Sequence, residues 1–151
     1  TSFKQAVMLL GMNKLFRWAA MLLTAAREGG PPPAVGQTAV IRGRLMELLA
    51  KHSLTETDTD LAFICGMFSF AEWLRVGQLA AALALIPVSE AVSAALLRHE
   101  GVLGELLILT QACESQDLDQ FDRSADNLEL EHNDINQAHL QALSWTECLS
   151  D

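Results

Sequence analysis

The sequence predicts an all-α protein, a multi-helix bundle without a sheet. Apolar residues recur every three or four positions along most of the chain, which is the spacing of one face of an α-helix. No segment shows the strict alternation of a convincing strand. Half of the 151 residues are apolar, which is ample material for one core. We therefore expect a single all-helical unit over residues 1–151.

About nine segments have helical spacing. They cover residues 1–10, 13–26, 38–51, 60–74, 79–86, 89–97, 102–115, 121–128 and 133–149. Residues 28–37, EGGPPPAVGQ, are expected to form a loop, because three consecutive prolines do not fit a helix interior. Thr38 is then expected to cap the third segment.

The fourth segment, Asp60–Leu74, is expected to lie at the centre of the bundle. Its sequence, DLAFICGMFSFAEWL, carries apolar side chains on two stripes, so it can be buried from two directions. Residues 56–60 are expected to form a polar break that supplies caps and acidic first-turn residues for this helix.

Short signals are expected to set the ends of the later helices. Ser89 with Glu90 begins one helix, and Glu100-Gly101 ends it. Gly104 is expected to allow a close helix crossing, and Asn133 to cap the closing helix.

Charge and composition exclude several classes of protein. The net charge is −9, and residues 111–151 carry ten acidic side chains and one basic side chain, so this part would repel a phosphate backbone. No apolar run approaches the roughly 18 residues of a membrane span, and no secretory leader pattern opens the chain. We expect neither a nucleic-acid nor a membrane partner.

The three cysteines, Cys65, Cys113 and Cys148, are odd in number and far apart in sequence. We therefore expect them to be reduced core residues of a cytoplasmic protein.

Short stretches in a fixed order over nearly the whole chain carry a family resemblance. They are Ser2-Phe3-Lys4-Gln5-Ala6 with Leu10-Gly11, Leu15 and Trp18; Ile41-Arg42-Gly43-Arg44 with Glu47-Leu48-Leu49-Ala50; Phe63-Ile64-Cys65-Gly66-Met67-Phe68-Ser69; Pro87 with Ser89 and Ala95-Leu96-Leu97; and Glu100-Gly101, Leu103-Gly104, Leu106-Leu107, Glu114 and Asp117, closed by Ala142 and Trp145. Each stretch is weak alone. Together they resemble the HD-related output domain (HDOD), in the form that follows an EAL cyclic di-GMP phosphodiesterase domain in bacterial signalling proteins.

The resemblance implies a helical bundle distantly related to the HD-domain phosphohydrolases. It also implies that the chain is the C-terminal part of an HDOD domain whose upstream helices, and an EAL domain, are absent. Apolar surface meant for those helices would then be exposed, so we expect a homo-oligomer.

The same resemblance argues against catalysis. HD phosphohydrolases hold metal ions with an adjacent His-Asp pair on a helix of this kind. Aligning Gly66-Met67 with the residues that precede the pair puts Ser69 and Phe70 in its place, and neither replaces a metal ligand. Ser69 also lacks the surroundings of a nucleophile, and we expect its hydroxyl to bond back to its own helix. We expect no catalytic residue, cofactor or metal site.

The histidines and the acidic cluster have simpler structural explanations. His132 and His139 would stand about 10 Å apart on one helix, too far to hold one ion, so they are expected at the surface or an interface. His99 is expected as a cation near a helix C-terminus. The acidic residues Glu114, Asp117, Asp119 and Asp122 lack the spacing of a calcium loop and are expected to form a solvated face.

The residues singled out are charged and belong to the stretches of the resemblance: Arg42, Arg44, Glu47, Glu100 and Glu114. A structural ion-pair network that ties helices together is the first hypothesis for them, and a ligand or partner site is the alternative.

The expected function is a non-catalytic regulatory or interaction module in a cyclic di-GMP or two-component pathway. Its partners would be other domains of the same protein, such as the EAL domain, or other signalling proteins. The alternatives are a residual metal-dependent phosphohydrolase with unrecognised ligands, and a scaffold that acts by dimerisation.

Overall fold

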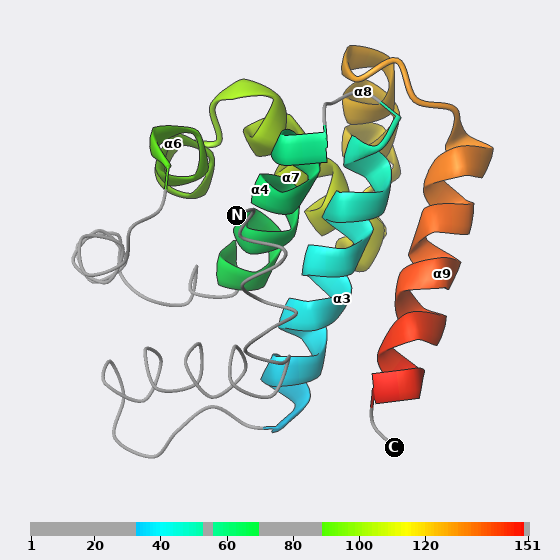
Figure 1. The fold of residues 1–151 in the computed structure, drawn as a ribbon. Helices are drawn as coiled ribbons and strands as arrows, with labels where there is room; N and C mark the ends of the chain where they lie inside the picture. Colours follow the sequence, from blue (N-terminus) through cyan, green and yellow to red (C-terminus); the bar gives the residue numbers. More distant parts are fainter. Residues whose placement is uncertain (1–32, 53–55, 70–88, 150–151) are drawn as a thin grey trace.

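The computed structural model describes residues 33–52, 56–69 and 89–149, and these residues form six helices and no strand (Figure 1). The helices are α3 (Pro33–Ala50), α4 (Glu56–Phe68), α6 (Glu90–Arg98), α7 (Gly101–Ser115), α8 (Leu118–Asn127) and α9 (His132–Leu149). The all-helical class is therefore confirmed for the described residues, whose six helices correspond to six of the nine predicted segments. The predicted segments 1–10, 13–26 and 79–86 lie outside the described residues.

α3 and α4 together form the centre of the bundle. α3 contacts α4, α7 and α9, while α4 also contacts α6 and α7. In Figure 1, α3 lies between α4 and α9. The sequence places only the fourth segment at the centre, but α3 is buried as deeply, since all side chains from Arg42 to Ala50 except that of Arg44 are buried. No helix among the described residues is long and apolar enough to cross a membrane.

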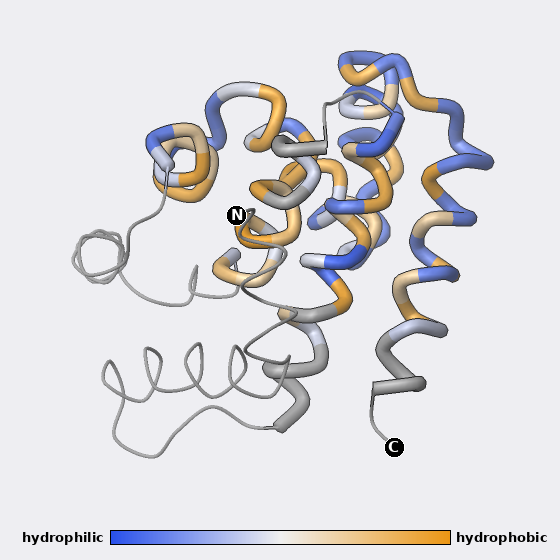
Figure 2. The backbone as a smooth tube through the Cα atoms, in the orientation of Figure 1, coloured by the Kyte–Doolittle hydropathy of each residue, from blue (hydrophilic) through white to orange (hydrophobic). Residues whose placement is uncertain are grey.

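Side chains at helical spacing in the predicted segments form the core of the described bundle. The buried ones among them are Leu45, Leu48, Leu49, Ile64, Met67, Phe68, Leu103, Leu106, Leu107, Thr110, Ala125, Ile135, Ala138 and Ala142. Figure 2 shows the apolar residues gathered where α4, α6 and α7 meet and the hydrophilic ones along the outer sides of α8 and α9. Each large apolar side chain that is fully buried contributes about 1.5–3 kcal/mol.

The two central helices touch through their backbones at Gly43 and Gly66. A Cβ atom on Gly66 would lie 2.6 Å from the Cα atom of Gly43 and 2.7 Å from the carbonyl oxygen of Arg42. A Cβ atom on Gly43 would lie 2.9 Å from the carbonyl oxygen of Phe63. No side chain fits at this crossing, so the two glycines set the distance between α3 and α4.

Three predicted helix starts are wrong, two of them by several residues. α3 begins at Pro33 and not at Thr38, because a proline is well suited to the first helical position. α4 begins at Glu56, so residues 56–60 form its first turn and are not a break. α9 begins at His132, and Asn133 is therefore inside the helix and does not cap it.

The ends of α6, α7 and α8 share one geometry. His99, Gln116 and Glu129 adopt left-handed backbone conformations, with φ angles of 54°, 58° and 55°. In α7 and α8, the N–H of the following residue donates to the carbonyl five residues back, at 3.2 and 2.9 Å, which is the bond of the Schellman motif. In α6, the N–H of Glu100 donates to the carbonyl of Ala94, six residues back, at 3.3 Å. These bonds satisfy carbonyl groups that a helix end leaves unpaired.

The turn from α6 to α7 corrects two further predictions. The residue that turns the chain at the end of α6 is His99, not the predicted Glu100-Gly101 pair. A Cβ atom on Gly104 would lie 2.3 Å from the carbonyl carbon of His99. Gly104 therefore allows α7 to pack on this turn and does not mark a crossing with another helix.

Two of the three cysteines can be placed, and both are free thiols. Cys65 is buried, and desolvation raises the pKa of its thiol to about 12. Cys113 is half-buried, and desolvation with the nearby Glu114 carboxylate raises its pKa to about 11. Both thiols stay protonated at neutral pH, as expected for reduced core residues. The side chain of Cys148 lies outside the described residues.

Replacing Gly66 with alanine tests the backbone contact between α3 and α4. Where nothing obstructs the added methyl group, replacing glycine with alanine inside a helix raises the free energy of unfolding by about 1 kcal/mol. Here the added methyl group meets backbone atoms of α3, so we expect Gly66→Ala to lower the free energy of unfolding by about 1–3 kcal/mol. Urea unfolding, followed by circular dichroism, measures this free energy of unfolding.

Ala91→Gly on the exposed side of α6 serves as the control, because it reports the helix-propensity effect without a packing change. A Gly66→Ala protein as stable as the wild type, or more stable, would contradict the close crossing.

Candidate functional site

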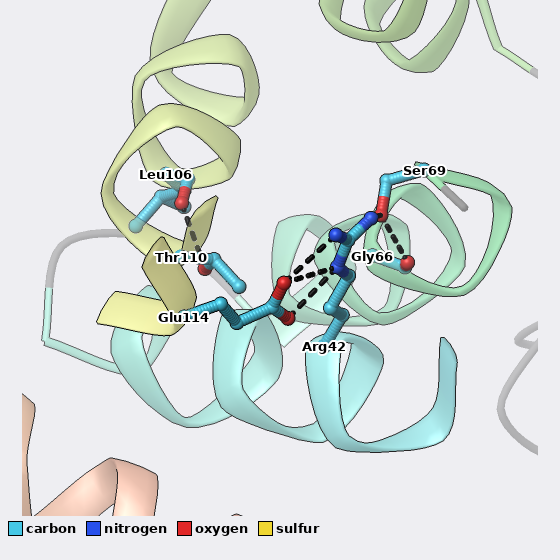
Figure 3. A network of polar contacts seen from close by, with 6 residues as sticks. All are labelled: Arg42, Gly66, Ser69, Leu106, Thr110 and Glu114. Carbon is cyan, nitrogen blue, oxygen red and sulfur yellow. Dashed lines mark hydrogen bonds and ion pairs between the residues drawn. The ribbon is translucent and has the colours of Figure 1, made fainter. Parts of the chain in front are cut away.

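Arg42 on α3 joins the C-terminal ends of α4 and α7 (Figure 3). Its Nε atom donates to both carboxylate oxygens of Glu114, at 2.8 and 2.9 Å. Its Nη2 atom lies 2.7 Å from Oε2 of the same carboxylate. Its Nη1 atom donates to Oγ of Ser69 at 3.3 Å. The guanidinium group thus contacts two helices at once from a third, and we call Arg42, Ser69 and Glu114 the Arg42 cluster.

The Arg42 cluster is shielded from water. The side chain of Arg42 is 10 % exposed and that of Glu114 is 25 % exposed. Hydrogen bonds between ionised groups are about twice as strong as neutral ones, and the planar guanidinium suits a carboxylate that accepts from two nitrogens. The bond to Glu114 therefore strongly favours one relative placement of α3 and α7.

Ser69 connects the Arg42 cluster to the glycine crossing. Its Oγ atom donates to the carbonyl oxygen of Gly66 at 2.6 Å while it accepts from Arg42. The prediction that this hydroxyl bonds back to its own helix is confirmed. One turn before Glu114, Thr110 similarly donates to the carbonyl oxygen of Leu106 at 2.9 Å, which satisfies a second buried hydroxyl.

Helix dipoles explain why a cation is stable at this place. Ser69 follows the last residue of α4, and Glu114 lies in the last turn of α7, so two negative helix ends converge here. A carboxylate at a helix C-terminus is unfavourable by itself. The Arg42 guanidinium compensates for both the carboxylate and the two helix ends.

A second group of side chains joins α3, α4 and α9, and we call it the Arg44 cluster. Nη1 of Arg44 lies 2.5 Å from Oε2 of Glu47, one turn further along α3. The guanidinium carbon of Arg44 lies 5.1 Å from the centre of the Trp145 ring on α9, within cation–π range. The Trp145 ring in turn meets Phe63 of α4 edge to face, with centroids 6.4 Å apart. The buried Nε atom of Arg44 has no hydrogen-bond partner among the described residues.

Glu100 is separate from both clusters. It lies between α6 and α7 and pairs with Arg98, whose Nε atom is 3.0 Å away. Arg98 also reaches Glu90 at 3.3 Å, and all three side chains are at least half exposed. Exposed pairs of this kind contribute little to stability. The five predicted residues therefore form two clusters and one surface pair, not a single network.

Glu100 also borders a cavity of about 400 Å³ between α4, α6 and the start of α7. The cavity is lined by Leu61, Ala91, Ala94, Glu100, Gly101, Val102 and Leu103. Apart from Glu100, its walls are apolar or glycine, and it contains no residue of either cluster.

The predicted acidic face keeps three of its four members. Asp117, Asp119 and Asp122 are exposed. Asp117 accepts the N–H of Gln120 at 3.0 Å and so caps α8. Glu114 is an exposed residue as well, but its carboxylate is bound by Arg42 and is not freely solvated.

The histidines are placed largely as expected. Nε2 of His132 lies 3.3 Å from Oδ1 of Asp122, and both side chains are more than half exposed. The His132 ring also meets Phe121 edge to face, with centroids 5.0 Å apart. His139 is half-buried on α9, and His99 lies at the C-terminus of α6. Over the described ranges, no group of three or more His, Cys, Asp or Glu side chains could hold a metal ion.

Two contacts of these clusters are not predicted by the sequence. The hydroxyl of Ser69 is expected to bond only to its own helix, and Trp145 enters only through the family resemblance, yet Ser69 contacts Arg42 and Trp145 contacts Arg44. Arg42 and Glu114 are 72 residues apart in sequence, so no local spacing could have paired them.

Two curated proteins resemble this chain over nearly its whole length. It is 26 % identical over 147 residues to "Cyclic di-GMP phosphodiesterase CdgJ" of Vibrio cholerae, a match that covers 97 % of this chain and 34 % of CdgJ. It is 29 % identical over 153 residues to "Uncharacterized protein YuxH" of Bacillus subtilis, covering 99 % of this chain and 37 % of YuxH. The chain thus spans about a third of the length of these relatives. Comparisons with family models and with solved structures found no match.

Replacing Arg42 with lysine tests the geometry of the Arg42 cluster while keeping the charge. A lysine ammonium cannot donate in fork geometry to Glu114 and reach Ser69 as well. We expect Arg42→Lys to lower the free energy of unfolding by about 1–3 kcal/mol.

The matched control is Arg98→Lys, because Arg98 also pairs with glutamates but is half exposed. We expect Arg98→Lys to lower the free energy of unfolding by less than about 0.5 kcal/mol. Equal effects of the two substitutions on denaturant unfolding would show that fork geometry does not matter at Arg42.

Proposed function

We propose that the chain is a non-catalytic signal-transduction module of the HDOD type, working in a cyclic di-GMP signalling protein. The printed name of CdgJ supports the pathway, because the match to CdgJ covers 97 % of this chain. The ordered stretches of the resemblance support the HDOD type. The chain would be the C-terminal part of that domain, distantly related to HD phosphohydrolases and located in the cytoplasm.

The observation that carries the proposal is the guanidinium group of the Arg42 cluster. The resemblance places Ser69 where an HD phosphohydrolase has a metal-holding residue. Here the Ser69 hydroxyl bonds to Gly66 and Arg42, and Glu114 balances the arginine charge. A metal ion beside Ser69 would have to lie next to a fixed positive charge, with a hydroxyl and a carboxylate that are both already engaged by Arg42. The described residues around Ser69 therefore suit an arginine cation better than a metal ion.

In the proposed mechanism, the helices act as one body that neighbouring domains contact. The Arg42 cluster holds the ends of α4 and α7 to α3, and the Arg44 cluster holds α9 to α3 and α4. A domain that binds one of these helices would therefore act on all of them. The natural source of such input is another domain of the same polypeptide, such as an EAL domain, because the chain spans only about a third of its relatives.

A residual phosphohydrolase is the second candidate. The name of CdgJ, a phosphodiesterase, favours it. However, the match spans 34 % of CdgJ, which leaves most of that protein to carry the named activity.

Metal analysis combined with a hydrolysis assay separates the two candidates. Protein purified without chelator would be analysed for Mn, Fe and Ni, and incubated with bis(p-nitrophenyl) phosphate and with cyclic di-GMP. We expect metal far below one ion per chain and no turnover above the buffer, with or without added Mn²⁺.

Variants with alanine in place of each of the four histidines, His52, His99, His132 and His139, serve as controls, since any activity of this chain that depends on histidine ligands should fall in at least one of them. Metal close to one ion per chain, together with turnover that a chelator abolishes, would refute the non-catalytic proposal.

A further inference from the structure

The outer side of α9 exposes two large apolar side chains one turn apart. Leu140 is 66 % exposed and Leu143 is 40 % exposed. They point away from the side of α9 that carries the buried Ile135, Ala138 and Ala142. In Figure 1, α9 lies at the edge of the bundle and packs on α3, and no other described helix covers its outer side. Among the described residues, the other exposed leucine is Leu118, which lies at the start of α8.

Around the two leucines, from Ile135 to Thr146, this side of α9 carries no charged side chain, although it lies in a very acidic part of the chain and Glu147 follows one turn after Leu143. From Ile135 to Thr146 there is no Asp, Glu, Lys or Arg, although residues 111–151 carry ten acidic side chains and one basic one. Asn136, Gln137, Gln141 and Ser144 surround the two leucines and are exposed. Depletion of charge around exposed apolar residues is typical of the centre of an interface.

We infer that this surface binds the same surface of a second copy of the chain, with the two α9 helices antiparallel. We define the α9 face as Asn136, Gln137, Leu140, Gln141, Leu143 and Ser144. An isologous contact requires a patch that complements itself. Amide and hydroxyl side chains meet this requirement, because each both donates and accepts hydrogen bonds.

The charge distribution favours a second copy of the chain, and not a basic partner, as the occupant of the α9 face. Two copies with a net charge of −9 repel each other, so they can approach best through a face that carries no charge. A basic partner would be attracted to the exposed carboxylates of α8 instead, where Asp117, Asp119 and Asp122 lie. Salt screens the repulsion between copies, so the dimer should strengthen as salt rises, whereas binding of a basic partner would weaken.

The association should be weak. One helix packed against its copy buries less than the roughly 1,200 Å² of a stable interface. Dissociation in the micromolar to millimolar range is therefore expected. The inference is independent of the proposed function, because the α9 face contains no residue of the Arg42 or Arg44 cluster.

Sedimentation velocity of the whole chain over micromolar to millimolar concentrations tests the inference. The wild type should pass from monomer to dimer, at lower concentration in higher salt. Leu140→Lys should weaken dimerisation by at least about tenfold, although it also reduces the net negative charge. Leu118→Lys makes the same change on α8 and should leave dimerisation unchanged, and circular dichroism checks that both variants fold.

A charge-swap experiment shows whether the α9 face meets itself. Leu140→Lys and Leu140→Glu proteins should each be monomeric alone and should dimerise when mixed in equal amounts. A monomeric wild type at all concentrations, or equal effects of Leu140→Lys and Leu118→Lys, would overturn the inference. Dimerisation that weakens with salt, or a mixture that stays monomeric, would overturn it as well.

Discussion

The backbone contact between Gly43 and Gly66 is the constraint on which the rest of the described structure depends. Because neither residue has a side chain, the backbones of α3 and α4 come into direct contact. Gly43 follows Arg42, and the Gly66 carbonyl accepts the hydroxyl of Ser69. The crossing therefore brings Arg42 to the end of α4, and its guanidinium group then binds Glu114 of α7. One close contact thus positions three helices.

The Arg42 cluster gives this arrangement its specificity more than its stability. Removing two charges from water costs several kcal/mol per ion, and their attraction offsets that cost only with good geometry. Apolar packing of residues such as Leu45, Leu106 and Ile135 supplies most of the stabilisation. That packing would tolerate a small shift of α7 along α3, whereas the bonds from Arg42 to both Glu114 oxygens would not.

Periodicity predicted the helices well because it reports which side of a helix is buried. Ile135, Ala138 and Ala142 are buried as the spacing required, and Ser89 caps α6 through the N–H of Val92, consistent with the predicted start of that helix. Helix ends were predicted poorly, because the competing signals there are similar in strength. Pro33 begins α3 where a loop was expected, and a non-glycine residue, His99, ends α6 although Gly101 lies two positions further on.

The candidate site was predicted in its residues but not in its connections. Spacing along one helix correctly puts Arg44 one turn from Glu47. The pairing of Arg42 with Glu114 depends instead on the tertiary packing of α3 against α7, for which the sequence has no periodic signal. For the same reason Glu100 was grouped with the other charges, although it lies at the opposite end of α7 from Glu114.

A double-mutant cycle on Arg42 and Glu114 tests most directly whether this pair joins α3 to α7. The free energies of unfolding of the wild type, Arg42→Met, Glu114→Gln and the double variant would be measured in denaturant. Any other contact of Arg42 is lost in both arms that remove it, so it cancels. The account predicts a coupling energy of about 1–3 kcal/mol between the two residues. Effects that add within about 0.5 kcal/mol would contradict it, because two residues in direct contact should not behave as independent sites.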